Sequence, residues 1–220
     1  MSQRRLTRTS NLWLAQTLWK LGAVQFGSFT LGRTTVNSPV YVNLRLLIGH
    51  PTALWRIAHI IRDEIQTLQR KLHPQVQPFD LVAGVPFGGL HCATAFSLTA
   101  KVPMIYLHPR MDDLGSDIEG LYHPNQRAII MDDLLAGGGS ILETALQLGE
   151  AGLIVRDAVV LLDRQQGGRE RRRRQGINMI SVLTLEVLMN YLKSSGKIDE
   201  DLYRPSMEFL ETHRHLEDDV

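Results

Sequence analysis

Hydrophobic residues in the first third of the chain follow patterns typical of two helices and a hairpin. Residues 11–21 have the apolar spacing of a short amphipathic helix, with Gly22 just past its end. Apolar and polar residues alternate around turn residues between positions 25 and 45, which predicts a hairpin. A longer helix begins at Pro51. Its apolar residues repeat at steps of three and four and predict one buried stripe, made of Leu54, Ile57, Ile61, Ile65, Leu68 and Leu72.

Strands and helices then alternate through the rest of the chain. Apolar runs predict strands at Leu81–Val85, Val102–Leu107, Arg127–Met131, Ala158–Leu162 and Asn178–Leu183. Helices are predicted at Leu90–Leu98 and Ser140–Glu150, and helical segments close the chain. The polar, acidic stretch His108–Gln126 is predicted to be a loop. These units imply an α/β fold, in which a mostly parallel central sheet has helices on both faces and the N-terminal helix and hairpin form a hood.

Composition and charge restrict the class of protein. Of the 220 residues 44% are hydrophobic and 21% are charged, as in soluble globular proteins. No repeat or linker divides the chain, which predicts one domain over positions 1–220, with a core of about 11–212 and polar tails. The net charge of +1 argues against nucleic-acid binding. Cys92 is the only cysteine, the N-terminus is polar and basic, and no apolar run is long enough for a membrane. We therefore expect a cytoplasmic protein without a membrane partner.

The segment from Ala128 to Ser140 carries the strongest chemical signal. It reads Ala-Ile-Ile-Met-Asp-Asp-Leu-Leu-Ala-Gly-Gly-Gly-Ser, an apolar strand followed by Asp132 and Asp133 and then by three glycines. Free N–H groups at the start of the next helix attract an anion, typically phosphate. Two adjacent carboxylates are suited to bind a pair of hydroxyls or a metal-bound water. The alternative is an ordinary strand–loop–helix turn with solvated acids.

This segment resembles the phosphoribosyl-pyrophosphate (PRPP) motif of type I phosphoribosyltransferases. The resemblance implies that Asp132 and Asp133 hold the ribose hydroxyls of PRPP and, through PRPP, a Mg²⁺ ion. It also implies that the 5′-phosphate is bound by Ala136, Gly137, Gly138, Gly139 and Ser140. Ala136 and Gly137 stand where the family usually has threonines. Because backbone donors survive these changes, phosphate binding is expected to be weakened and not abolished.

Segments outside the motif narrow the resemblance to orotate phosphoribosyltransferase. These segments are Phe26–Leu31, Ser38–Arg45, Gly84–Leu90 and Leu161–Gly168, in the order of that family. The resemblance implies a turn that contacts pyrophosphate, made of Val85, Pro86, Phe87, Gly88 and Gly89. It assigns orotate binding to Arg164, Arg33 and Tyr41. The alternative for Arg164 is a structural ion pair with Asp163 or another acid. The implied ligands are orotate, orotidine 5′-monophosphate (OMP) and PRPP, and the implied assembly is a homodimer.

Two features of that family are missing from this chain. Gly32 replaces a lysine that contacts orotate and the sugar side, with Arg33 next to it as a possible substitute. The family's catalytic loop also supplies lysines and a histidine, and here it is degenerate: His108, Arg110 and Asp112 lie at its catalytic positions. The best register places Pro109, Asp112 and Leu114 at the two lysines and the histidine. The segment between His108 and Leu121 contains one arginine and four acidic residues, which gives it a formal charge of −3.

Two classes of function therefore remain open. The departures from the family all affect PRPP, which favours an orotate phosphoribosyltransferase-like protein whose transferase activity is impaired or lost. The alternative is a fully active enzyme, or a subunit completed in trans by an intact paralogue in a mixed dimer. The basic run Arg169–Arg174 is interpreted as a solvated helix face, with RNA or an acidic partner as the alternative.

Overall fold

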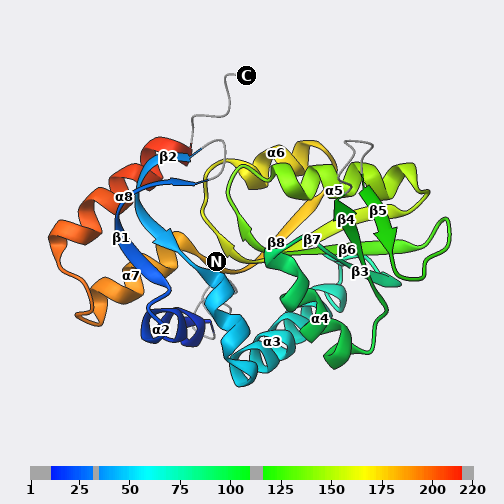
Figure 1. Cartoon of the computed structure of the whole chain (residues 1–220), viewed down its shortest axis with the longest axis horizontal. Coiled ribbons are helices and arrows are strands. Elements are labelled where there is room, and N and C mark those ends of the chain that lie inside the picture. Colours follow the sequence, from blue (N-terminus) through cyan, green and yellow to red (C-terminus); the bar gives the residue numbers. More distant parts are fainter. Residues whose placement is uncertain (1–10, 32–34, 110–115, 215–220) are drawn as a thin grey trace.

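The computed structural model describes residues 11–31, 35–109 and 116–214. Its centre is a six-stranded sheet with the strand order β5-β4-β3-β6-β7-β8 (Figure 1). All neighbouring strands in this sheet are parallel except β5, which is antiparallel to β4. The strands are β3 (Leu81–Gly84), β4 (Met104–Pro109), β5 (Ser116–Glu119), β6 (Arg127–Leu135), β7 (Ile154–Asp163) and β8 (Asn178–Thr184).

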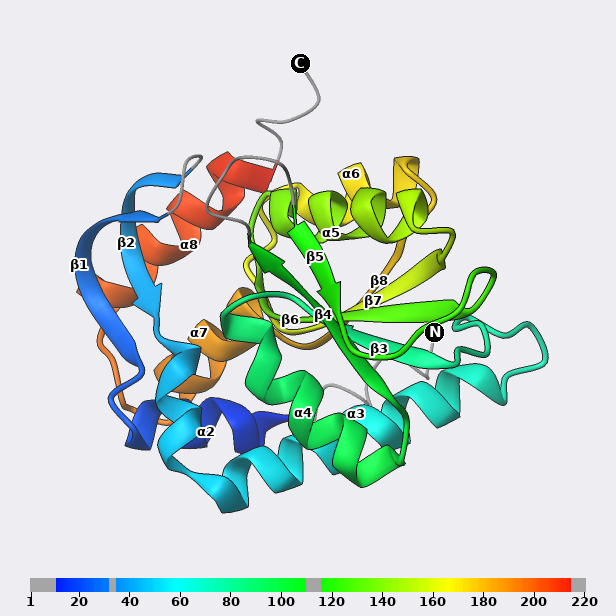
Figure 2. The ribbon, with the colours of Figure 1, turned by 45° about the vertical axis from the view of Figure 1, so that its right-hand side comes forward.

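Helices cover both faces of this sheet, as the sequence predicts. One face packs against α3 (Pro51–Gln69) and α4 (Gly88–Ala100), and the other against α5 (Gly139–Glu150) and α6 (Gly168–Arg174) (Figure 2). Alternate strand residues supply the two cores, since neighbouring side chains of a strand point to opposite faces. The core on the α3 and α4 side contains Val82, Ile129, Met131, Val159 and Leu161. The core on the α5 side contains Ala83, Ile130, Ala158 and Val160.

The N-terminal and C-terminal segments together form the hood beside the sheet. It consists of α2 (Leu12–Lys20), the antiparallel hairpin of β1 (Val24–Leu31) and β2 (Thr35–Val42), the 3₁₀ helix η1 (Leu44–Gly49), α7 (Leu185–Ser194) and α8 (Glu200–Arg214). In Figure 1 these elements lie at the left, next to the carboxyl ends of the parallel strands. Contacts of α8 with β2 and of α2 with α7 join the two ends of the chain. The predicted fold class is therefore confirmed.

Three local predictions are wrong. The segment predicted to be a loop contains β5, because an edge strand needs only one paired side, and Ile118 supplies its packing against the core. The strand expected to stop at Met131 continues to Leu135, since Leu134 and Leu135 pair with β7. Leu72 lies beyond the end of α3 and is 92% exposed.

Among the described residues, none of the helices combines the length and the apolar character needed to cross a bilayer.

Candidate functional site

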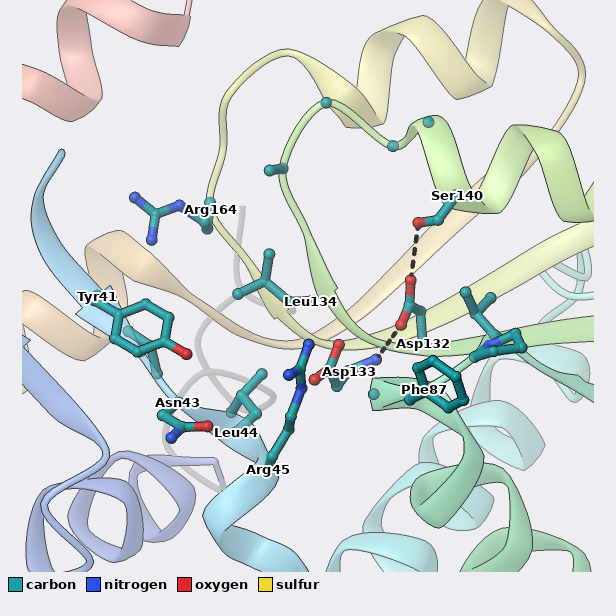
Figure 3. Close-up of a pocket in the computed structure, with 18 of the residues that line it drawn as sticks. Tyr41, Asn43, Leu44, Arg45, Phe87, Asp132, Asp133, Leu134, Ser140 and Arg164 are labelled. Carbon is teal, nitrogen blue, oxygen red and sulfur yellow. Dashed lines mark hydrogen bonds between the residues drawn. The ribbon is translucent and has the colours of Figure 1, made fainter. Parts of the chain in front are cut away.

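A pocket of about 880 Å³ opens where the carboxyl ends of the parallel strands meet the hood (Figure 3). Ligand sites in open α/β sheets lie at this edge. The sheet, the loops that follow its strands and the first turns of α4 and α5 contribute Val85, Pro86, Phe87, Gly88, Asp132, Asp133, Leu134, Ala136, Gly137, Gly138, Gly139, Ser140, Glu143 and Arg164. The hood contributes Phe29, Thr30, Tyr41, Val42, Asn43, Leu44 and Arg45. Residues far apart in the sequence therefore share one cavity.

Asp132 and Asp133 lie side by side on β6 with different surroundings. Asp132 is buried, with 5% of its surface exposed. Its Oδ1 accepts a hydrogen bond from the backbone N–H of Asp133 at 2.8 Å, and its Oδ2 accepts one from the Ser140 hydroxyl at 3.2 Å. Burial and the neighbouring Asp133 raise the pKa of Asp132 well above its ordinary value. Ser140, the one hydroxyl kept in the phosphate motif, thus donates to Asp132.

The segment from Ala136 to Ser140 forms the loop expected for an anion. Gly138 has a φ of +73°, a conformation that residues with a side chain rarely adopt, and α5 begins at the next residue. Ala136, Gly137, Gly138 and Gly139 all line the pocket. The loop therefore presents backbone and the start of a helix to the cavity, an arrangement whose N–H groups suit an anion.

The turn between β3 and α4 forms another wall of the pocket. Val85, Pro86, Phe87 and Gly88 line the cavity, and 75% of the surface of Phe87 is exposed. Gly89 lies behind them, where a Cβ atom would come within 2.3 Å of the backbone oxygen of Met131. The first turn of α4 can therefore approach β6 only because this position lacks a side chain.

Arg164 follows β7 and is nearly fully buried, with 1% of its surface exposed. Its guanidinium donates to Ser38 Oγ at 2.8 Å, to the Val40 carbonyl at 3.3 Å and to Gln166 Oε1 at 3.1 Å. All three acceptors are neutral, and burial lowers the pKa of Arg164 to about 10. The alternative of an ion pair with Asp163 is not found. A buried cation that lines a pocket and bonds only neutral described groups is suited to bind a ligand carboxylate.

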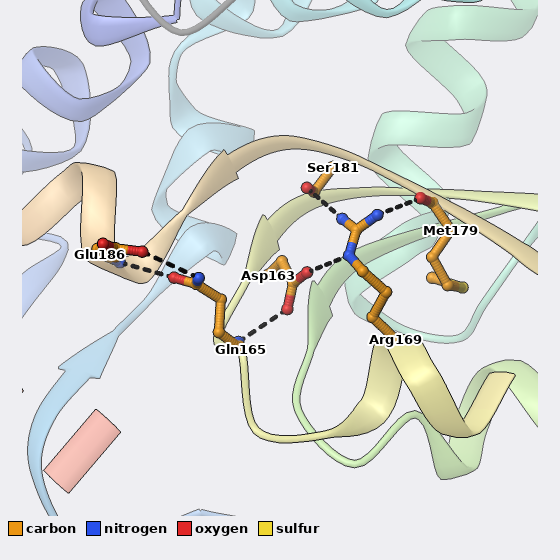
Figure 4. Close-up of polar contacts among 6 residues, drawn as sticks. All are labelled: Asp163, Gln165, Arg169, Met179, Ser181 and Glu186. Carbon is orange, nitrogen blue, oxygen red and sulfur yellow. Dashed lines mark hydrogen bonds and ion pairs between the residues drawn. The ribbon is translucent and has the colours of Figure 1, made fainter. Parts of the chain in front are cut away.

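Asp163 instead forms a network that fixes the segment around Arg164 (Figure 4). Its Oδ2 accepts from Arg169 Nε at 3.0 Å and its Oδ1 accepts from the Gln165 N–H at 2.8 Å. Arg169 also donates to the Met179 carbonyl and to Ser181 Oγ, both on β8. Gln165 exchanges two hydrogen bonds with Glu186. The loop on both sides of Arg164 is therefore tied to β8 and to α7.

The same network corrects the interpretation of the basic run. Arg169 is bonded into the sheet, and Arg172 has only 2% of its surface exposed. The Nε atom of Arg172 lies 3.2 Å from the place where a Cβ on Gly138 would be. The solvated helix face is therefore wrong for Arg172, which is buried behind the loop 136–140. Arg173 and Arg174 are exposed as expected, and Arg169 is partly exposed but bonded to the sheet.

The structure thus brings most of the predicted site residues together and leaves a few aside. Arg33, Arg110 and Asp112 lie outside the described residues. His108 is exposed on β4 and does not line the pocket. Sequence reasoning missed Arg45 and Glu143 as pocket residues. Arg45 closes the Ser38–Arg45 segment that marks the family, which was the signal available for it. Among the described residues no three His, Cys, Asp or Glu side chains gather as a metal site, so a cation here would need ligand oxygens.

Known proteins of similar sequence and structure share this architecture. No protein-family model matches the chain. The chain is 36% identical over 202 residues to orotate phosphoribosyltransferase of Chlamydia caviae, a match that covers 89% of this chain and 92% of the chlamydial one. It is 34% identical over 196 residues to uridine 5′-monophosphate synthase of Bos taurus, where the match covers 88% of this chain. The chain spans only 39% of the length of that bovine relative.

Solved structures agree with these sequence matches. The orotate phosphoribosyltransferase of Aeropyrum pernix has a TM-score of 0.67 and 31% identity, covering 81% of this chain and 98% of that one. The UMP synthase of Leishmania donovani has a TM-score of 0.80 and 31% identity, covering 93% of this chain and 43% of that one. Because the chlamydial relative is matched over nearly its whole length and the fold agrees, the chain belongs to the orotate phosphoribosyltransferase family.

Proposed function

We propose that this protein serves pyrimidine metabolism by binding orotate or OMP, and PRPP, while its ability to transfer phosphoribosyl from PRPP to orotate is impaired or lost. One contrast carries the proposal. The pocket unites an acid pair, a glycine-rich anion loop and a buried arginine, whereas the segment that the family resemblance assigns to catalysis contains no lysine.

Binding of the pyrimidine rests on Arg164. Its desolvated guanidinium has only neutral acceptors among the described residues, so a planar carboxylate would relieve a buried charge. Tyr41 lines the same part of the pocket, and its ring lies 5.6 Å from that of Phe29. Two aromatic rings and one cation suit a flat anionic ring such as orotate.

Binding of PRPP rests on the other end of the cavity. The carboxylates of Asp132 and Asp133 can accept from two ribose hydroxyls, and the loop 136–140 offers backbone donors to a 5′-phosphate. A Mg²⁺ ion would come with the diphosphate of PRPP and take ligand oxygens beside this acid pair. Missing threonine hydroxyls should weaken affinity, since each neutral hydrogen bond contributes roughly 0.5–1.5 kcal/mol.

Impaired chemistry follows from the charge of the segment after β4, which lacks the lysines of the family. Transfer develops negative charge on the departing pyrophosphate, and positioned cations stabilise it. Between His108 and Leu121 the formal charge is −3, so this segment would repel the leaving group. Loss of one stabilising donor commonly lowers a rate by roughly 10²–10³.

Two measurements on the purified protein test this proposal. Calorimetry with orotate, OMP and Mg²⁺–PRPP should detect binding, and a coupled assay of orotate consumption should detect little turnover. Turnover at the ordinary rate of enzymes, roughly 1–10³ s⁻¹, would refute the loss of activity. Absence of binding to all three ligands would refute the function altogether.

A variant with the family's residues in the segment after β4 gives a matched comparison of turnover. The triple variant Pro109→Lys, Asp112→Lys and Leu114→His restores the residues that the family resemblance places there. We expect this variant to gain turnover while its affinity for OMP stays unchanged. A control with Pro109→Gln, Asp112→Gln and Leu114→Gln removes the acid without adding cations and should gain much less.

A subunit completed in trans is the second candidate. It is favoured by the contrast between an assembled pocket and a segment after β4 that contains no lysine. Addition of an intact paralogue, itself disabled in its own pocket, should then produce turnover that neither protein has alone. If purified mixtures contain only self-associated chains and stay inactive, this candidate is excluded.

A further inference from the structure

Arg45 lies at the start of η1, directly after the hairpin. Leu44 and Leu47 on either side of it are buried, with 2% and 0% of their surfaces exposed. These anchors hold η1 against α3, α4 and β6. Arg45 itself is exposed and lines the pocket, and Figure 3 shows its guanidinium directed into the cavity beside Asp133. The backbone of η1 therefore presents this side chain from a fixed base.

Arg45 differs from the other cation of the pocket in the state of its donors. Five charged residues line the cavity, namely Arg45, Arg164, Asp132, Asp133 and Glu143. Each nitrogen atom of Arg164 already donates one hydrogen bond, to Ser38, Val40 or Gln166, which leaves the second N–H of each terminal nitrogen for a ligand. Within the described part of the chain, the side chain of Arg45 makes no hydrogen bond. None of its nitrogen atoms lies within 4.0 Å of a carboxylate oxygen, the distance that defines an ion pair. Its donors are thus available to a ligand.

The position of Arg45 indicates which part of a ligand it would meet. The Asp133 carboxylate touches Gly88, where a Cβ atom would lie 2.3 Å from Asp133 Oδ2. Arg45 stands beside the same carboxylate (Figure 3). Burial lowers the pKa of His91 in the first turns of α4, with the Asp133 charge raising that pKa and the Arg45 charge lowering it, so both charges lie near this turn. An anion placed at the turn 85–88 would therefore lie between the start of α4 and the Arg45 guanidinium. The loop 136–140 and Arg164 lie on other walls of the cavity.

We propose that Arg45 binds the diphosphate group of PRPP and free pyrophosphate, as the cation that the lysine-free segment after β4 does not supply. This inference rests on the proposed function, because it assigns a further residue to the same pocket. A guanidinium can bind two phosphate oxygens at once, which suits a diphosphate whose opposite side faces backbone donors. Arg45 would give PRPP affinity without the lysines of the family's catalytic loop, so binding of PRPP and its turnover become separable.

The test is calorimetry on the full chain with three ligands, Mg²⁺–PRPP, Mg²⁺–pyrophosphate and OMP. We expect Arg45→Gln to weaken binding of PRPP and pyrophosphate by roughly 10-fold to 100-fold, the range for a hydrogen-bonded charge pair. OMP carries no diphosphate, so its affinity should change by less than about twofold. Arg45→Lys keeps the charge and loses the planar fork, and should fall between the wild type and Arg45→Gln.

A matched control and two outcomes separate this inference from the proposed function. Arg70→Gln removes another exposed arginine, at the end of α3 and away from the pocket, and should leave all three affinities unchanged. If wild-type protein binds PRPP and Arg45→Gln binds it equally well, the role of Arg45 is refuted while the function stands. If Arg45→Gln weakens OMP as much as PRPP, Arg45 acts on the pocket as a whole and the diphosphate assignment fails. If wild-type protein binds neither PRPP nor OMP, the proposed function itself fails.

Discussion

Gly88 lies so close to Asp133 that a Cβ atom at position 88 would come within 2.3 Å of the Asp133 Oδ2 atom. The turn after β3 and the acid pair of β6 are therefore in direct contact. A side chain at position 88 and the present orientation of the Asp133 carboxylate exclude one another.

This contact predicts different outcomes for two neighbouring glycines. Gly88→Ala pushes a half-buried side chain, which can rotate, so it should weaken PRPP binding more than it lowers stability. Gly89→Ala meets the Met131 backbone oxygen at 2.3 Å, which cannot give way, and should cost roughly 1–3 kcal/mol of unfolding free energy. Gly149→Ala, on α5 outside the pocket, has no atom within 4 Å of its new Cβ and serves as the control. Urea unfolding measures stability, and equal losses at 88 and 89 would contradict the prediction.

Asp132 predicts a pH dependence of stability. Burial and Asp133 raise its pKa in the folded chain, so the folded state keeps a proton that the unfolded state releases. The stability contributed by Asp132 is full below its ordinary pKa of about 3.9 and is lost as pH rises through the raised value. Asp132→Asn cannot ionise. This variant should therefore be more stable than the wild type at pH 8, with a difference that shrinks toward pH 4.5.

Thermal unfolding across that pH range checks the sign. A difference that stays constant with pH would show that Asp132 is not the titrating group. Because Asn loses an acceptor for a ribose hydroxyl, we also expect Asp132→Asn to bind PRPP less tightly, so stability and binding should change in opposite directions.

Arg164 predicts that orotate stabilises the protein through its carboxylate. A saturating ligand at 100 times its dissociation constant adds about 2.7 kcal/mol to unfolding free energy. Uracil has the same ring without the carboxylate and should give no comparable rise in melting temperature. Arg164→Lys cannot keep the three bonds to Ser38, Val40 and Gln166, and should lose at least roughly tenfold in orotate affinity. Equal stabilisation by uracil and orotate would count against this role.

The contacts of Arg169 predict that its removal lowers the unfolding free energy, although its basic sequence neighbourhood is typical of a solvent-exposed helix. Its loss leaves Asp163, whose side chain is 3% exposed, without its charged partner. Charged hydrogen bonds contribute more than neutral ones, but the Arg169 side chain is 46% exposed, so we expect Arg169→Met to cost about 1–2 kcal/mol. Adding Asp163→Asn should recover part of that loss, and Arg70→Met should cost little. A chemical denaturation series of these variants gives the four free energies.

The larger elements were predictable because their apolar periodicity reflects burial on one or two faces. The hairpin, α3 and the parallel strands follow directly from such patterns, and Asp132, Asp133 and the glycine loop follow from their place after a buried strand. Tertiary pairing decided the rest. Ser116–Glu119 becomes a strand only because β4 offers it an open edge. Arg169 is bonded to Asp163, and Arg172 is buried next to Gly138, which the charge pattern of the run did not indicate. The segment Ser38–Arg45 pointed to Arg45 as a residue of the site, but its role could not be assigned from sequence, since that role depends on which wall of the pocket η1 joins.

The bonds from Arg164 to Ser38 and Val40 span 126 and 124 positions of the chain. Contacts of such long range require closure of a large loop and form late relative to local helices. Secondary structure can therefore be largely in place before Arg164 and the hairpin come together to form their side of the pocket. A chain emerging from the ribosome has no complete cavity until residue 164 is available, so ligand affinity reports complete maturation more strictly than helical content does.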